Sequence, residues 1–227
     1  MKPRDPVWLF DLDNTLHDAG AWVFGQISAA MTEFLRRELG LSREEADELR
    51  RHYWRRYGAT LLGVVKHHDI RAAHFLHDTH RLPELEQRVG GHRHDAIALA
   101  RLRGRKFVLT NAPQRYAERV LAALGIARHF EAVIAIERMK VFGELRPKPD
   151  ARMLRVVAAR LKVPPSRCVL VEDTLEHQRA AKRIGMQTVW MQRYMRPAPA
   201  GGVPPAPARP IVPAYVDRIV HGLRELC

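Results

Sequence analysis

Five short apolar runs, separated for the most part by amphipathic helical patterns, most constrain how this chain of 227 residues can fold. Each run is too short to cross a membrane and has the uninterrupted apolar character of a strand buried on both faces. Strands that alternate with helices imply a doubly wound α/β core built on a parallel sheet. The predicted strands are Val7 to Phe10, Phe107 to Leu109, Ala132 to Ile136, Cys168 to Val171 and Thr188 to Met191.

Three helical segments between the later strands have recognisable ends. Asn111, followed shortly by a proline, is the expected N-cap of the helix QRYAERVLAALG, which Gly125 terminates. The segments DARMLRVVAARL and TLEHQRAAKRIG are also amphipathic, and Gly185 closes the second. These segments supply the crossover helices that a parallel sheet requires.

The long segment between the first two strands is almost entirely helical in pattern, and Ser42 with Glu45 forms a capping box within it. The economical interpretation is a helical cap at residues 18–91, inserted into a core formed by residues 1–17 and 92–227. Residues 197–213 hold seven of the fifteen prolines, which predicts an extended surface loop within the core.

Charge and composition narrow the possible partners. The 38 Lys and Arg against 25 Asp and Glu give a net charge of +13, which favours anionic partners. The arginines are scattered over helical stretches rather than gathered in a tail, so a solvated surface is favoured over a nucleic-acid role. No apolar run is long enough for a membrane span or a signal peptide, and two cysteines give no disulfide framework. We therefore expect a cytoplasmic protein, with monomer and homodimer both left open.

Polar side chains follow the predicted strands at the points where ligands bind in open α/β sheets. Four of them are carboxylates, which would repel one another unless a cation lay among them. A magnesium ion suits an oxygen-rich set that also receives a substrate phosphate oxygen. A lysine and a hydroxyl in the set would hold the other phosphate oxygens. The residues are Asp11, Asp13, Thr110, Asn111, Lys148, Glu172 and Asp173.

The order of these motifs resembles that of the haloacid dehalogenase-like hydrolase superfamily. The resemblance rests on DLDNT, on the apolar run ending in Thr110 and Asn111, on Lys148 with the following proline, and on VEDT. The helical insertion after the first motif resembles members with a type-one cap. The segments YGATLLGVVKHH, TNAPQRYAERVLAALGI and VEDTLEHQRAAKRIGMQTVW resemble the pyrimidine 5'-nucleotidase branch.

The resemblance implies a role for each motif residue. Asp11 would be the nucleophile and Asp13 the general acid and base. Asp11, the backbone carbonyl of Asp13 and Asp173 would hold Mg²⁺, with Glu172 orienting a metal-bound water. Thr110, Asn111 and Lys148 would bind the phosphate. One departure follows the fourth motif, where Glu176-His177-Gln178 stands in place of the Asn or Asp that relatives often carry.

These roles predict a magnesium-dependent phosphatase for a small phosphorylated metabolite, in first place a pyrimidine nucleoside 5'-monophosphate. The resemblance places Tyr57 and Thr60 of the cap near the leaving group, with packing within the cap as the alternative for Tyr57. His67, which follows the YGATLLG segment, is a further candidate for substrate contact, with a solvent-exposed position as its alternative. Phosphoglycolate and sugar phosphates are alternative substrates. A haloacid dehalogenase and a nucleic-acid-binding module are the rivals from other classes.

Overall fold

A computed structural model describes residues 5–195 and 212–227 of the chain. These residues form a six-stranded sheet in the order β3-β2-β1-β6-β7-β8, in which every neighbouring pair is parallel. A separate antiparallel hairpin pairs β4 with β5. The strands are β1 (Val7–Phe10), β2 (Arg105–Leu109), β3 (Ala132–Ile134), β4 (Lys140–Val141), β5 (Glu144–Leu145), β6 (Cys168–Glu172), β7 (Gln187–Met191) and β8 (Arg218–Val220).

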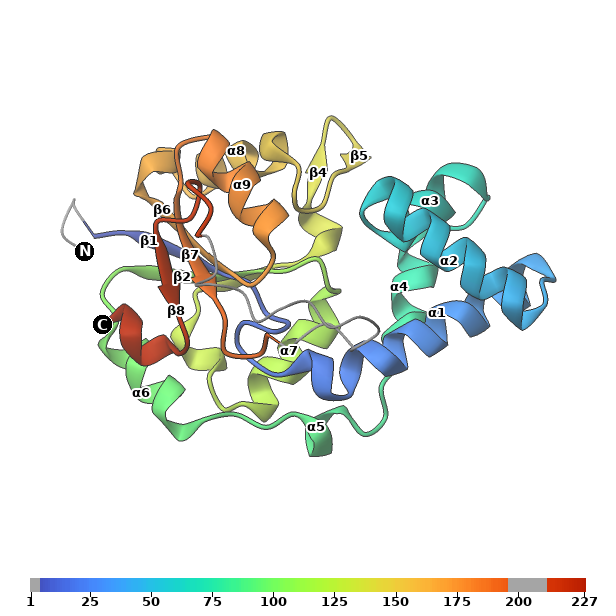
Figure 1. The fold of residues 1–227 in the computed structure, drawn as a ribbon, viewed down its shortest axis with the longest axis horizontal. Helices are drawn as coiled ribbons and strands as arrows, with labels where there is room; N and C mark the ends of the chain where they lie inside the picture. Colours follow the sequence, from blue (N-terminus) through green and yellow to red (C-terminus); the bar gives the residue numbers. More distant parts are fainter. Residues whose placement is uncertain (1–4, 196–211) are drawn as a thin grey trace, which may run out of the picture.

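Helices surround the sheet and extend to one side of it (Figure 1). The α-helices are α1 (Val23–Leu39), α2 (Arg43–Tyr57), α3 (Thr60–His67), α4 (Ala72–Thr79), α5 (Leu85–Arg88), α6 (Arg93–Arg101), α7 (Gln114–Ala123), α8 (Ala151–Arg160) and α9 (Leu175–Arg183). Two 3-10 helices matter below, η3 (Ile136–Arg138) and η5 (Leu223–Leu226). This architecture confirms the predicted doubly wound α/β class.

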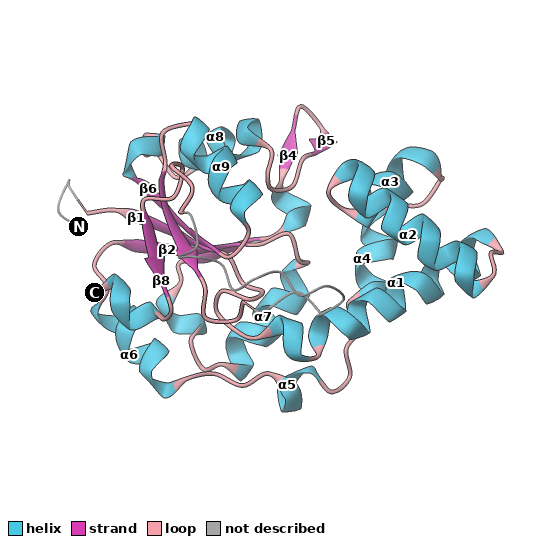
Figure 2. Cartoon of the chain, viewed as in Figure 1, coloured by secondary structure: helices cyan, strands magenta, loops and turns pink. Residues whose placement is uncertain are grey.

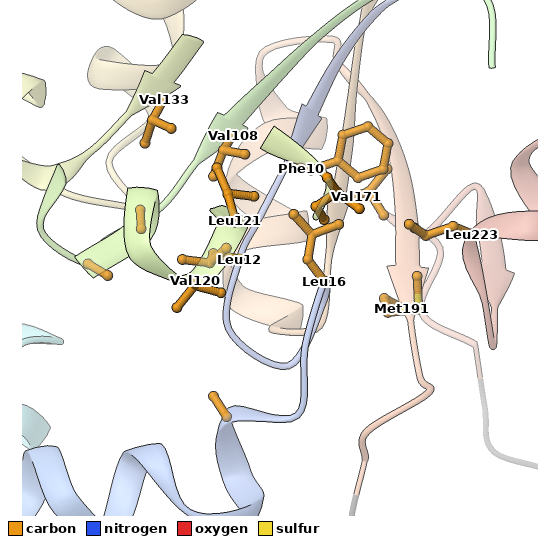
Figure 3. Packing of buried hydrophobic residues seen from close by; sticks show 14 of the residues in the cluster. Phe10, Leu12, Leu16, Val108, Val120, Leu121, Val133, Val171, Met191 and Leu223 are labelled. Carbon is orange, nitrogen blue, oxygen red and sulfur yellow. The ribbon is translucent and has the colours of Figure 1, made fainter. Parts of the chain in front are cut away.

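The two faces of the sheet are covered by different helices, because successive side chains of a strand point to opposite faces. Phe10, Val108 and Val171 belong to a cluster with residues of α6, α7 and η5. Figure 3 shows this face, with Val120 and Leu121 of α7 beside the strands. The alternate strand positions pack with α8 and α9 and include Val7, Leu9, Phe107, Leu109, Cys168 and Leu170. Both faces are buried, as the uninterrupted apolar runs require.

Helices α1 to α4 build a second apolar core beside the sheet, all-helical in Figure 2. Phe34, Tyr53, Val64 and Phe75 come one from each of these helices, and Ile136 of η3 reaches this cluster from the sheet side. The chain that follows α4 packs differently, since Leu82, Leu85 and Val89 join the cluster of α6 and α7. The inserted segment therefore packs in two parts, α1 to α4 and the chain that follows α4. The boundaries of a cap at residues 18–91 stay a prediction.

Several local expectations need correction. The third strand ends at Ile134 rather than at Ile136, because the next residues turn into η3. At the C-terminal end, β8 forms one edge of the sheet and η5 follows it. Gly125 and Gly185 have positive φ, as expected for residues that end helices. The proline-rich stretch predicted as a loop, residues 197–213, lies outside the described residues except for its last two.

Candidate active site

The loop after β1 carries the first two candidate residues. Asp11 continues the line of the strand, and its backbone N–H donates to Val171 O at 2.9 Å. The chain then turns back: Leu16 N donates to Leu12 O at 2.8 Å, and Asn14 has a φ of 57°, a left-handed conformation that asparagine tolerates. The tight turn sends Asp11 and Asp13 to the same edge of the sheet.

Lys148 lies between two carboxylates. Its Nζ donates to Asp11 Oδ1 at 2.6 Å and to Glu172 Oε2 at 2.7 Å, and all three side chains are buried. Asn111 fixes the lysine backbone: Lys148 N donates to Asn111 Oδ1 at 2.9 Å, and Asn111 Nδ2 donates to Lys148 O at 3.0 Å. Asn111 was expected to cap α7, but Pro113 occupies that position and the amide serves the lysine instead.

Burial of so many charges in one place shifts their pKa values. Burial raises the pKa of Asp11 to about 7, and Glu172 adds to this, while Lys148 works against it. Burial raises the pKa of Asp173 to about 9, with Glu172 and Asp11 acting in the same direction. Burial also opposes charge on Glu172 and Lys148. Lys148 and His177 nevertheless hold the pKa of Glu172 below its usual range, and the two carboxylates hold the pKa of Lys148 above its own.

The carboxylates of Asp11, Glu172 and Asp173 form a group that fits a divalent cation. One oxygen from each lies within 4.8 Å of the others. Hard cations such as Mg²⁺ prefer such oxygen ligands, and an added positive charge would favour the ionised forms that burial opposes. His177, on α9, lies beside this group, with Nδ1 3.0 Å from Glu172 Oε2. This is the position where the sequence departs from the expected Asn or Asp.

Asp13 has partners that the sequence analysis missed. Its Oδ1 accepts from Tyr116 Oη at 2.6 Å, and His17 Nε2 lies 2.9 Å from the same oxygen. Tyr116 is on α7, shortly after the second motif. His17 lies four positions after Asp13, in the loop that follows β1. Tyr116 stands inside a segment that carried the family resemblance, and His17 lies two positions after the DLDNT motif. The feature of the sequence that could have identified these two partners was a polar ring close to a motif.

A cavity of about 530 Å³ opens over these residues between the core and the cap. The core contributes Asp11, Asp13, Thr110, Asn111, Lys148, Glu172 and Asp173. The cap contributes mostly apolar side chains, namely Phe24, Ile27, Met31, Trp54, Leu61, Phe75 and Leu76, together with Arg50 and His80. All seven core positions predicted from the sequence therefore line one space.

The three cap residues predicted to contact the substrate are not brought together. Within the described chain, the cavity wall includes Thr60 but neither Tyr57 nor His67. Tyr57 Oη lies 2.5 Å from His67 Nε2, so these two side chains face each other. The hydroxyl of Thr60 donates to Arg50 O at 3.2 Å. Trp54 lines the cavity and is 63% exposed as a residue, one helical turn before the tyrosine that the sequence singled out.

The family of the chain follows from a family model, that of the haloacid dehalogenase-like hydrolases, which matches residues 7–185. The match includes every core position named above and the whole inserted segment. The chain therefore belongs to the haloacid dehalogenase-like hydrolases, as the order of its motifs predicted.

Particular relatives resemble parts of the chain. Phosphate metabolism protein 8 of Saccharomyces cerevisiae is 25% identical over 194 residues, covering 81% of this chain and 60% of that protein. Fructose-1-phosphate phosphatase YqaB of Escherichia coli is 36% identical over 80 residues, covering 35% of this chain and 40% of its own length. The chain thus spans three fifths or less of these curated relatives.

The fold is also shared with a solved structure, that of CbbY from Rhodobacter sphaeroides in complex with phosphate. The TM-score is 0.61 at 20% identity, and the match covers 98% of this chain and 96% of that one. Among residues 5–195 and 212–227, no helix combines the length and the apolar character needed to cross a bilayer.

Proposed function

We propose that this protein is a magnesium-dependent phosphatase that hydrolyses a small phosphomonoester through an aspartyl-phosphate intermediate. The observation that carries the proposal is the cavity lined by Asp11 and Asp13, in which a buried lysine pairs with Asp11 and a three-carboxylate group lies beside it. A nucleophile, a proton carrier, a fixed cation and a metal site are the parts that phosphoryl transfer through a carboxylate requires.

In this mechanism a carboxylate oxygen of Asp11 attacks phosphorus, and the bond from phosphorus to the leaving oxygen breaks. Asp13 gives its proton to that oxygen. It then takes a proton from the water that attacks the phosphorus of the aspartyl-phosphate, which releases phosphate and restores Asp11. Thr110 and Lys148 stabilise the charge on the transferred group, and Asn111 acts by holding the lysine backbone.

The metal site of the proposal consists of Asp11, Asp173 and the backbone carbonyl of Asp13, with Glu172 at its side. Bound Mg²⁺ would supply positive charge to the phosphoryl oxygens. Lys148 lies on the Glu172 side, and the imidazole of His177 lies on the same side. The charge of Lys148 favours the ionised form of Glu172, which burial opposes.

For the substrate, we propose a pyrimidine nucleoside 5'-monophosphate. The cap side of the cavity is mostly apolar and presents two exposed aromatic residues, Phe24 and Trp54, which suit a flat base better than a polyol. A sugar phosphate is the second candidate, favoured by the similarity to fructose-1-phosphate phosphatase over 35% of the chain.

The test is a phosphate-release screen across nucleoside monophosphates, sugar phosphates and phosphoglycolate, each with magnesium and with EDTA. We expect turnover that EDTA abolishes and that is fastest with pyrimidine monophosphates. Fastest release from a sugar phosphate would move the assignment to the second candidate. Halide release from a 2-haloacid without metal, in place of phosphate release, would identify a dehalogenase and overturn the proposal.

A further inference from the structure

Among residues 5–195 and 212–227, the carboxylate of Asp13 has side-chain partners at Oδ1 only. A single oxygen, Oδ1, meets Tyr116 Oη at 2.6 Å and His17 Nε2 at 2.9 Å. The two partners also lie next to each other, with 3.4 Å from Tyr116 Oη to His17 Nε2. The His17 side chain is 1% exposed and that of Asp13 is 17% exposed, while Tyr116 is 1% exposed as a whole residue. The part of Asp13 that remains accessible therefore faces the cavity.

The two partners hold Asp13 from different parts of the fold. His17 belongs to the same loop, and its backbone forms an isolated bridge with Asp13. Tyr116 lies 103 positions away along the chain, on the helix that follows β2, and its ring packs in the sheet core with Phe10 and Leu16. A displacement of the carboxylate would thus leave a buried hydroxyl without its acceptor, which is costly in a dry environment.

We propose that Tyr116 and His17 are positioning residues for proton transfer by Asp13. They bind Oδ1 from the buried side and so leave Oδ2 as the oxygen that exchanges the proton with the leaving group and then with water. The inference rests on the proposed function, because it assumes that Asp13 is the proton carrier. Oδ2 of Asp13 is thus the oxygen that carries the proton, and Tyr116 and His17 are the side chains that orient it.

Asp13 needs positioning residues for a geometric reason. An aspartate side chain turns about two bonds, and a carboxylate without fixed partners samples several orientations. Proton transfer needs the oxygen within hydrogen-bond reach of the leaving atom, so misorientation of about 1 Å lowers the rate by up to about 10². Substrate binding through Lys148 and the metal group would be left unchanged. A positioning defect should therefore lower kcat/KM through the transfer step and not through binding.

A leaving-group comparison separates positioning from packing. An alkoxide leaving group needs a proton as the bond to phosphorus breaks, whereas p-nitrophenolate leaves without one. Tyr116→Phe keeps the ring in the core and removes only the hydroxyl. We expect kcat/KM, which reports phosphoryl transfer to Asp11 and not the later hydrolysis, to fall about 10- to 100-fold on an alkyl monoester and less than about 3-fold on p-nitrophenyl phosphate.

Tyr53→Phe is the matched control. Tyr53 is also a buried tyrosine whose hydroxyl meets a histidine nitrogen, that of His68 at 2.8 Å, but within the cap cluster. Its loss should leave the ratio of the two substrates unchanged. His17 gives a second, independent pair: His17→Ala removes the donor, while His17→Gln carries a side-chain N–H to a similar position and should restore part of the alkyl-ester rate.

Each outcome of these experiments either supports or overturns the positioning role of Tyr116 and His17. Equal losses on both substrates in Tyr116→Phe, or no loss on either, overturn the inference. Should Tyr116→Phe fail to give a cooperative thermal transition, the His17→Ala and His17→Gln pair takes the decision by the same ratio. A wild-type protein without magnesium-dependent turnover would sink the proposed function itself. If wild type is active and Asp13→Asn shows the selective loss while the Tyr116 and His17 variants do not, only the positioning inference falls.

Discussion

Lys148 Nζ lies 2.6 Å from Asp11 Oδ1, and this ion pair is buried. The lysine also bonds Glu172, so one cation serves two carboxylates that come from β1 and β6, neighbours in the sheet. This ion pair holds the side chain of Asp11, the candidate nucleophile, in one position without a bound ligand. It also makes the local fold depend on one positive charge, since removing one member of a buried pair leaves the other uncompensated.

Lys148→Met should therefore destabilise the protein as well as inactivate it. The methionine keeps the length of the side chain and removes the charge, and we expect the free energy of unfolding to fall by about 3 to 5 kcal/mol. Millimolar magnesium should narrow the difference from wild type, because a divalent cation supplies charge to the same carboxylates. Urea denaturation with and without magnesium measures both effects.

A surface ion pair provides the control for that variant. Lys182 pairs with Asp217, and both side chains are more than a third exposed. Lys182→Met should change the free energy of unfolding by less than about 1 kcal/mol, because solvent screens exposed pairs. Magnesium should not affect its stability relative to wild type. Equal destabilisation by the two lysine variants would show that the site charge does not depend on Lys148.

Asp11→Asn should remove turnover and leave the fold intact. The amide is nearly the same shape but is not a nucleophile, so no aspartyl-phosphate can form. It also removes one member of a crowded group of carboxylates, which limits the loss of stability. We expect a rate below the detection limit in the phosphate-release assay and a cooperative thermal transition. Turnover near the wild-type rate would refute the covalent mechanism.

The sequence predicted the sheet and the core side of the site because both depend on local patterns. The strands are buried on both faces and thus appear as apolar runs, and parallel strands bring the residues that follow them to one edge. That is how Asp11, Thr110 and Glu172 could be placed together from positions far apart in the chain. The capping box of Ser42 and Glu45 is equally local, and both of its hydrogen bonds are present.

The remainder depends on contacts that no local pattern specifies. The bonding of Asn111 to Lys148 and of Tyr116 to Asp13 joins residues 37 and 103 positions apart, so neither partner predicts the other. On the cap, the face that a helix turns to the cavity is set by packing against its neighbours. Tyr57 and Trp54 are three positions apart on α2, and no local pattern distinguishes which of them faces the cavity.

Stability should depend on pH through His80. Burial lowers the pKa of this histidine to about 4, although Asp13 pulls it upward. Between about pH 6.5 and pH 4 the unfolded chain then binds more protons at this residue than the folded chain, so stability falls as the pH falls through that range. One pKa unit corresponds to about 1.4 kcal/mol, which sets an upper limit of about 3 kcal/mol.

The variant His80→Gln should flatten this part of the pH profile. Urea denaturation at several pH values between 7 and 4 compares it with wild type and with His94→Gln, which removes an exposed histidine. As the pH falls, the free energy of unfolding of His80→Gln should rise relative to that of wild type. An identical slope for the two histidine variants would contradict a lowered pKa at the partly buried His80.

Substrate selection should depend on Trp54 rather than on Tyr57. Trp54 lines the cavity and is 63% exposed as a residue, so its ring offers an apolar face that a base would cover. Tyr57 is turned to His67 instead. Trp54→Ala should raise KM for pyrimidine monophosphates about 10-fold or more, since base–aromatic stacking contributes about 1 to 3 kcal/mol. It should change KM for glycerol phosphate, which has no ring, by less than about 2-fold on the same grounds. Tyr57→Ala should leave the ratio of the two KM values at its wild-type level; a larger shift for Tyr57→Ala than for Trp54→Ala would place recognition where the sequence alone had predicted it.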